Sequence, residues 1–177
     1  DEERAAVKKT FAFKEGEEEK AAGYLSQKDV FRECLLKDLE RMGYVGDETG
    51  KKVLYLAATS RKFQHPVSVL SVANSAAGKS FAQETILSLV PDDEVLSFTR
   101  LSPMSLSHFG RNDLRHRLIN IDELSGIDPV EAMYQLRSLI SRGILTAGLT
   151  SIYRQTGKME TLHKEVLGPV AVMTSTT

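Results

Sequence analysis

One eight-residue stretch has the residue types and spacing of a phosphate-binding loop. It is Ala73-Asn74-Ser75-Ala76-Ala77-Gly78-Lys79-Ser80: a small residue, four further residues and then Gly-Lys-Ser. Small side chains let backbone N–H groups curl around a polyphosphate, and a glycine lets the chain pass close to it. A helix that begins here presents unpaired N–H groups and a positive dipole end to the anion. The stretch therefore predicts a nucleotide-binding loop, which we extend to Phe81.

Two side chains at the end of this loop carry the expected chemistry. Lys79 supplies a mobile positive charge for the β- and γ-phosphates, and Ser80 offers a hydroxyl to Mg²⁺. Mg²⁺ takes few protein oxygens and keeps several waters, so a single hydroxyl suits it. The expected ligands are ATP and Mg²⁺.

Two acids after an apolar run are the expected partners of the loop. The run Leu118–Ile121 predicts a strand that lies beside the strand before the loop, and Asp122 and Glu123 follow it. Asp122 would emerge at the carboxyl edge of the sheet, where ligands bind, and hold Mg²⁺ through water. Glu123 is one residue on, so it points elsewhere and could polarise an attacking water. The adjacent acid favours hydrolysis.

The last apolar run, Val170–Met173, ends in hydroxyl side chains: Thr174, Ser175, Thr176 and Thr177. Placed between the two motifs, these hydroxyls suit a sensor of the γ-phosphate or of the water. The alternative is a strand cap that satisfies backbone groups. The residues alone do not decide between the two.

Strands and helices alternate in the part of the chain that must position these residues. Short β-branched runs predict strands at 67–72, 94–99, 118–121 and 170–173, and helical periodicity predicts helices at 79–90, 102–110 and 129–143. This alternation indicates an α/β fold with a parallel sheet flanked by helices. A long hairpin over 144–167, turning at 155–158, is predicted before the last strand.

The first third of the chain is charged and predicted to be helical. We expect a helical segment over 1–64 and the core over 65–177. Residues 14–20 are typical of a solvated loop or a frayed element, and Ser26 is a plausible N-cap for a helix that ends at Gly43. A second helix is predicted over 51–62. Because the chain opens on Asp1, we expect it to be a piece of something longer.

Composition excludes several classes of protein. The chain has 177 residues and a net charge of −1, so it lacks the overall basic balance of many nucleic-acid-binding domains. No apolar run approaches 18 residues, which excludes a membrane span. The single cysteine, Cys34, cannot form an internal disulfide, so we expect an intracellular chain.

The order of these motifs resembles AAA+-type ATPases, and within them the superfamily III and MCM-type helicases. Three runs are similar to the ATPase region of bacterial, mobile-element-type DNA primase proteins: residues 55–62 (YLAATSRK), 75–80 (SAAGKS) and 168–170 (GPV). The resemblance covers residues 25–177. It implies that Lys79 and Ser80 hold nucleotide and Mg²⁺, and that Asp122 and Glu123 bind the metal and activate water.

The same resemblance implies further roles, and it implies that the chain is truncated before a helical lid. Thr177 falls where these ATPases carry a sensor asparagine, and Thr176 is a second candidate for that role. The hairpin resembles one that touches DNA in the central channel of ring helicases, with Arg154, Lys158 and Lys164 as phosphate contacts. From its residues alone, the hairpin could equally be a plain surface ribbon.

These expectations describe the ATPase core of a DNA replication protein in the bacterial cytoplasm. Its partners would be DNA, further copies of itself in a ring, and a primase domain in the same or a partner chain. Two alternatives stay open: a nucleotide-binding assembly or DNA-binding module with weak or no catalysis, and a small-molecule kinase.

Overall fold

The computed structural model describes residues 14–74, 78–124, 130–152 and 159–176. The chain divides between Glu48 and Thr49 into two compact units, which are described separately. The domain boundary predicted after residue 64 stays a prediction. Within the described residues, no helix is both long enough and apolar enough to cross a membrane.

The N-terminal unit holds α1 (Glu17–Leu25), a π-helical turn (Phe31–Leu35) and α2 (Leu36–Arg41), which continues that turn. Residues 17–20 are helical and mostly exposed, as the predicted alternative of a solvated element allows, and three acids in the first turn of α1 complement its dipole. One prediction for this unit is wrong. Ser26 ends α1 instead of capping the next helix, and Asp29 caps it through a 3.1 Å hydrogen bond from the Arg32 N–H.

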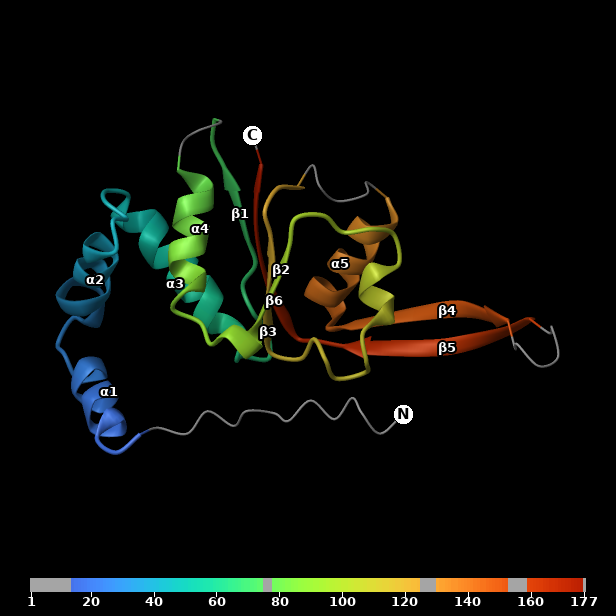
Figure 1. Cartoon of the computed structure of the whole chain (residues 1–177), viewed down its shortest axis with the longest axis horizontal. Helices are drawn as coiled ribbons and strands as arrows, with labels where there is room; N and C mark the ends of the chain where they lie inside the picture. Colours follow the sequence, from blue (N-terminus) through green and yellow to red (C-terminus); the bar gives the residue numbers. More distant parts are fainter. Residues whose placement is uncertain (1–13, 75–77, 125–129, 153–158, 177) are drawn as a thin grey trace. The chain divides into compact units, whose positions relative to one another are not determined.

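The second unit contains a four-stranded parallel sheet, which confirms the predicted α/β fold (Figure 1). Its strands are β1 (Val69–Val72), β2 (Val95–Phe98), β3 (Arg117–Ile121) and β6 (Val170–Thr176). Helices α3 (Glu48–Ser60) and α4 (Lys79–Leu87) cover one face, and α5 (Glu131–Arg142) covers the other. The helix predicted over 102–110 is only a short 3₁₀ turn, η3 (Ser105–His108).

The order of the strands is β1-β6-β3-β2, so the prediction that β3 lies beside β1 is wrong. The strand β6 lies between them and pairs with both: Thr174 is in register with Leu70 of β1 and with Ile121 of β3. Because β1 supplies backbone partners as far as Val72, which is in register with Thr176, β6 continues to Thr176. The hydroxyl-bearing residues Thr174–Thr176 therefore belong to the strand itself.

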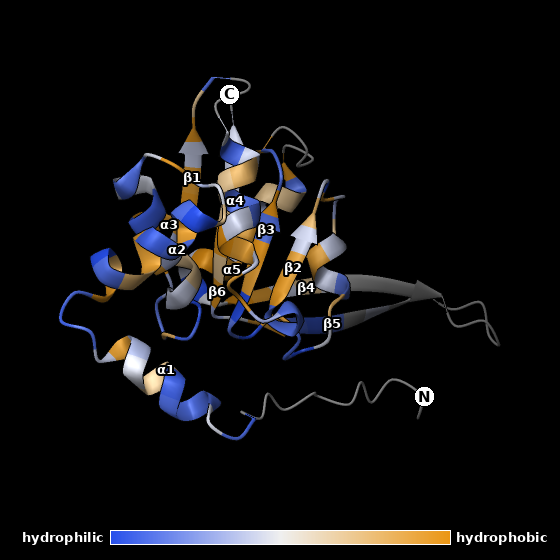
Figure 2. Ribbon diagram, turned by 60° about the vertical axis from the view of Figure 1, so that its left-hand side comes forward, coloured by the Kyte–Doolittle hydropathy of each residue, from blue (hydrophilic) through white to orange (hydrophobic). Residues whose placement is uncertain are grey.

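The main core lies between the sheet and α5. Ile119, Ile121 and Val172 pack with Leu136 and Leu139 of α5, and the strands are the most apolar part of the unit (Figure 2). Side chains alternate between the two faces of a strand, so the intervening residues of β3 and β6 face α3 and α4. Helical spacing over 129–143 predicts an apolar face of Met133, Leu136, Leu139 and Ile140, but in α5 Ile140 is exposed, and Gln135 is buried instead.

The predicted hairpin is confirmed. It consists of β4 (Ile144–Ile152) and β5 (Met159–Leu167), a separate antiparallel sheet whose ends coincide with the expected range (Figure 1). Its predicted turn at 155–158 lies outside the described residues. At its base Leu145 and Val166 are buried in the main core. Gly168 joins β5 to β6, and a Cβ there would come within 3.2 Å of the Gly143 backbone, so the close approach requires glycine.

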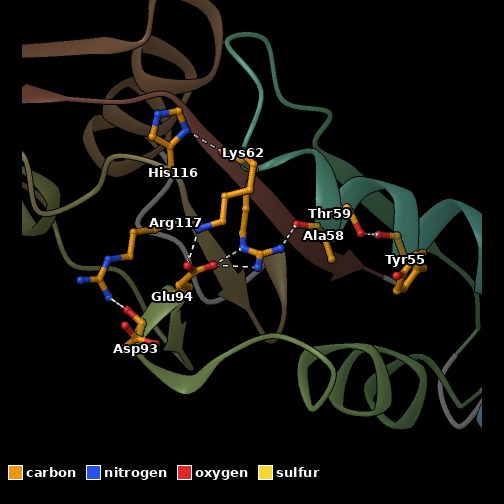
Figure 3. Close-up of polar contacts among 9 residues, drawn as sticks. Tyr55, Ala58, Thr59, Lys62, Asp93, Glu94, His116 and Arg117 are labelled. Atoms are coloured by element: carbon orange, nitrogen blue, oxygen red, sulfur yellow. Dashed lines mark hydrogen bonds and ion pairs between the residues drawn. The ribbon is translucent and has the colours of Figure 1, made fainter. Parts of the chain in front are cut away.

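Ion pairs fix the end of α3 against the amino edge of the sheet (Figure 3). The guanidinium of Arg61 lies 2.7 Å from the Glu94 carboxylate and donates a 2.8 Å hydrogen bond to the Ala58 carbonyl. Lys62 pairs with the other oxygen of the same carboxylate. Since Glu94 directly precedes β2, these contacts join α3 to the start of that strand.

Two further contacts extend this group along the same edge (Figure 3). The His116 Nδ1 lies 3.0 Å from the Arg61 carbonyl, and its backbone N–H donates a 2.8 Å bond to the Pro169 carbonyl. The guanidinium of Arg117, the first residue of β3, donates to the Asp93 carbonyl. We call Arg61, Lys62, Glu94, His116 and Arg117 the amino-edge cluster.

Candidate functional site

The predicted phosphate-binding loop joins β1 to α4, as the motif requires. Gly78 adopts a left-handed conformation with φ 79°, which a residue with a side chain rarely takes. Its carbonyl accepts a 2.9 Å bond from the Ala82 N–H, so α4 begins immediately after it. Ser75, Ala76 and Ala77 lie outside the described residues. The described ends of the loop therefore show the turn and the helix start expected of the motif.

Lys79 folds back over the loop. Its Nζ donates to the carbonyl of Ala73 and, at 3.2 Å, to the carbonyl of Asn74. The ammonium group is thus held above the loop by two backbone acceptors. A lysine fixed there places its charge at the position that a bound polyphosphate would occupy.

The first turn of α4 supplies the other groups expected at a phosphate site. The N–H groups of Lys79 and Ser80 belong to this turn, and the helix itself supplies no acceptors for the N–H groups of its first turn. Ser80 and Phe81 are exposed. A hydroxyl at Ser80 and the positive end of the helix dipole are consequently accessible to an anion and its counterion.

The predicted acids follow β3 directly, and both are exposed. The backbone of Asp122 is fixed on two sides: its N–H donates to Phe98 of β2 at 3.1 Å, and its carbonyl accepts a 2.7 Å bond from the Ser175 hydroxyl. Its carboxylate accepts a 3.2 Å bond from the Asn120 amide. Asp122 is thus held by β2, β3 and β6, while its side chain remains open to solvent.

The sheet brings the loop, the acids and the hydroxyls of β6 to one edge. Val72 is in register with Thr176, and the Ala73 N–H approaches the Thr176 carbonyl at 3.4 Å. On the other side of β6, Ser175 bonds to Asp122. Thr177 lies outside the described residues. The carboxyl edge therefore carries residues from both motifs, with the end of β6 between them.

One residue of this edge, Asn120, is absent from the sequence-based predictions. It lies inside the apolar run of β3 and is buried. An asparagine in the middle of a strand with apolar neighbours is a signal that sequence analysis could have used. Ser175 was predicted only as one of several hydroxyls that could act as a sensor or as a strand cap, and it is buried in β6, where it donates to the backbone carbonyl of Asp122.

The predicted nucleic-acid contacts are only partly visible. Arg154 and Lys158 lie outside the described residues. Lys164 of β5 donates a 2.9 Å bond to the His108 carbonyl of η3, and Arg111 pairs with Glu165 of β5 at 3.0 Å. Both contacts fix the base of the hairpin to the segment between β2 and β3.

The residues present fit a polyphosphate with its Mg²⁺. Around the Cβ position that Gly78 lacks, no atom of the described residues lies within 4 Å apart from Gly78 and its chain neighbours, which leaves room for an anion on this side of the helix start. A cation, Lys79, and an exposed carboxylate, Asp122, lie at the same sheet edge. Ser80 and Asp122 are oxygen donors of the kind that Mg²⁺ takes alongside phosphate oxygens and water.

Comparison with known proteins agrees with this geometry. No curated protein matches the chain. The family model of the MTBMA_p00010 P-loop domain matches residues 15–137, which is more than half of the chain and includes the loop, Asp122 and Glu123. The hairpin and β6 lie beyond the matched range. The chain belongs to the MTBMA_p00010 P-loop domain family and has the α/β fold of a P-loop NTPase.

Proposed function

We propose that this chain binds and hydrolyses ATP with Mg²⁺ at the carboxyl edge of its parallel sheet. One observation carries the proposal. The Gly78-Lys79-Ser80 loop follows β1, the acids Asp122 and Glu123 follow β3, and only β6 lies between these two strands. Membership of a P-loop domain family supports nucleotide binding, and the acid pair supports the further step of hydrolysis.

Each residue has a role that follows from its chemistry. The N–H groups after Gly78 and the Lys79 ammonium bind the phosphates, and Ser80 and Asp122 hold the metal, Asp122 through water. Mg²⁺, when bound, neutralises charge on the phosphate oxygens. Glu123 accepts a proton from the attacking water, and Thr176 or Thr177 positions that water or the γ-phosphate. Catalysis is then mostly a matter of positioning.

The variant Glu123→Gln tests the hydrolytic part. It removes the proton acceptor and keeps the size of the side chain, so ATP affinity should stay near wild type while turnover falls by about 10²- to 10⁴-fold. Steady-state phosphate release with Mg²⁺, with and without DNA, measures turnover, and calorimetry measures binding. Wild-type binding without any turnover would favour a nucleotide-binding assembly module. Equal turnover in the variant would remove Glu123 as the base.

We further propose that this ATPase is the motor module of a bacterial, cytoplasmic DNA replication protein of the primase-helicase type. The hairpin supports this extension, because β4 and β5 form a sheet of their own, separate from the parallel sheet (Figure 1). Arg154, Lys158 and Lys164 would contact DNA phosphates, in a ring of identical chains with a primase domain as partner.

The variant Lys158→Glu tests the DNA contact. It should weaken DNA affinity and make that affinity less dependent on salt, because one phosphate contact fewer releases fewer counterions. ATP affinity should not change. Lys28→Glu, an exposed lysine of the N-terminal unit with the same charge change, serves as the control. If both variants bind DNA as the wild type does, the hairpin is a structural ribbon only.

A further inference from the structure

The acid at the end of β3 is held by two buried side chains. Asn120 is 4% exposed and donates its amide to the Asp122 carboxylate at 3.2 Å. Ser175 is 3% exposed and donates its hydroxyl to the Asp122 carbonyl at 2.7 Å. The first bond fixes the carboxylate and the second fixes the backbone that carries it.

Both side chains reach Asp122 from the same face of the sheet. Asn120 is in register with Met173, and Ser175 follows two residues later on β6. Since alternate residues of a strand share a face, Asn120, Ser175 and Asp122 all lie on the side covered by α3 and α4. The residue at the carboxyl end of β3 is therefore supported from within its own strand and from the neighbouring strand.

The amide of Asn120 lowers the stability of the fold in a way that packing does not explain. Its carbonyl oxygen is buried, and within the described residues it has no hydrogen-bond partner. A buried acceptor without a partner destabilises the fold, whereas a leucine of similar size would avoid that penalty. The bond to Asp122 is what asparagine provides and leucine does not.

We propose that Asn120 and Ser175 are positioning residues that orient Asp122 toward the Mg²⁺ of the bound nucleotide. The inference rests on the proposed function and adds to it the residues that set the metal affinity of the site. Asn120 donates to Oδ1 of the Asp122 carboxylate, and this bond fixes the orientation of the exposed carboxylate. Side chains that orient a metal-binding carboxylate in this way commonly contribute 10- to 100-fold to metal affinity.

The test compares Mg²⁺ dependence with stability in Asn120→Leu and Ser175→Ala. For each full-length variant, binding of a fluorescent ATP analogue is titrated with Mg²⁺ and repeated in EDTA. Both variants should need at least about tenfold more Mg²⁺ for half-maximal enhancement of binding, with unchanged affinity in EDTA. Asn120→Leu should unfold at the same urea concentration as the wild type or a higher one, because it also removes the unpaired oxygen.

The matched control is Thr174→Val. Thr174 is also buried in β6 with a hydroxyl that lacks a partner among the described residues, but it lies on the opposite face from Ser175. Its Mg²⁺ midpoint should equal that of the wild type. If the wild type shows Mg²⁺-dependent binding and neither variant shifts the midpoint, the positioning role is wrong and the proposed function stands. If the wild type binds no nucleotide, the proposed function itself is wrong.

Discussion

The two edges of the parallel sheet use their charged residues in opposite ways. At the amino edge, two cations of the amino-edge cluster pair with its acid: Arg61 and Lys62 share the Glu94 carboxylate (Figure 3). At the carboxyl edge, Asp122 and Glu123 are exposed, and the Lys79 ammonium rests on backbone carbonyls. The amino edge pairs charge with charge, and the carboxyl edge keeps a cation and two acids available to a ligand.

The difference has an energetic basis. The side chain of Arg61 is only 10% exposed, so its charge has to be paired inside the protein. Burial of Glu94 would by itself raise the pKa of its carboxyl, but the hydrogen bonds and charges of Lys62 and Arg61 lower that pKa overall. The amino edge therefore contributes to stability. The carboxyl edge, with its exposed acids and open glycine turn, contributes little and is free to bind a ligand.

The largest expected effect comes from Lys79→Ala, which removes the cation of the carboxyl edge. ATP affinity should fall by roughly 100-fold, equivalent to about 2.7 kcal/mol, because the phosphates lose a charged partner. The free energy of unfolding should change by less than about 1 kcal/mol, because within the described residues the Lys79 ammonium bonds only to two loop carbonyls. Calorimetric titration and urea unfolding measure the two quantities. Unchanged ATP affinity would contradict the assignment of this edge.

The reverse pattern is expected for Glu94→Gln at the amino edge. It should lower the free energy of unfolding by about 1–3 kcal/mol near neutral pH, since it leaves Arg61 buried without its carboxylate. Because the folded-state pKa of Glu94 is lowered, this contribution is present above the usual glutamate pKa and is lost as the pH falls through the lowered value.

Urea unfolding at about pH 7 and about pH 3 measures that change. The difference between Glu94→Gln and the wild type should shrink in acid, and ATP affinity should stay at the wild-type value. A loss of stability that is the same at both pH values would show that the ion pairs of Glu94 do not stabilise this edge.

The smallest effect is expected for Lys62→Ala in the same cluster. Its side chain is 48% exposed, against 10% for Arg61, so solvent screens its pairing with Glu94. The free energy of unfolding should fall by about 0.5 kcal/mol or less at low salt. A loss as large as that of Glu94→Gln would mean that exposure is not what separates the two cations.

Local features of the fold could be predicted from sequence, and contacts across strands could not. The Gly78 turn, the start of α4 and the limits of the hairpin follow from residues close in the chain. The position of β6 between β1 and β3 depends on pairing between distant segments. The apolar run of β6 does not indicate which strands it pairs with. Ser26 and Asp29 are both good N-caps, so sequence could not decide which of them starts the helix.

The arrangement of the candidate site was predictable to the same extent. The motif and the acid pair predict roles for Lys79, Ser80, Asp122 and Glu123 from residues close in the chain, and these roles stay predictions. Asn120 and Ser175 act only through a partner, and the Ser175 contact joins residues 53 positions apart. Contacts of this kind become visible only once the sheet is assembled.

The central claim is best tested by a crystal structure of the full chain with Mg²⁺ and a non-hydrolysable ATP analogue. We expect the triphosphate against the backbone N–H groups of residues 78–80, with the metal between the Ser80 hydroxyl and Asp122. A triphosphate bound anywhere else on the chain, or a metal that makes no contact with Asp122 directly or through water, would contradict the account.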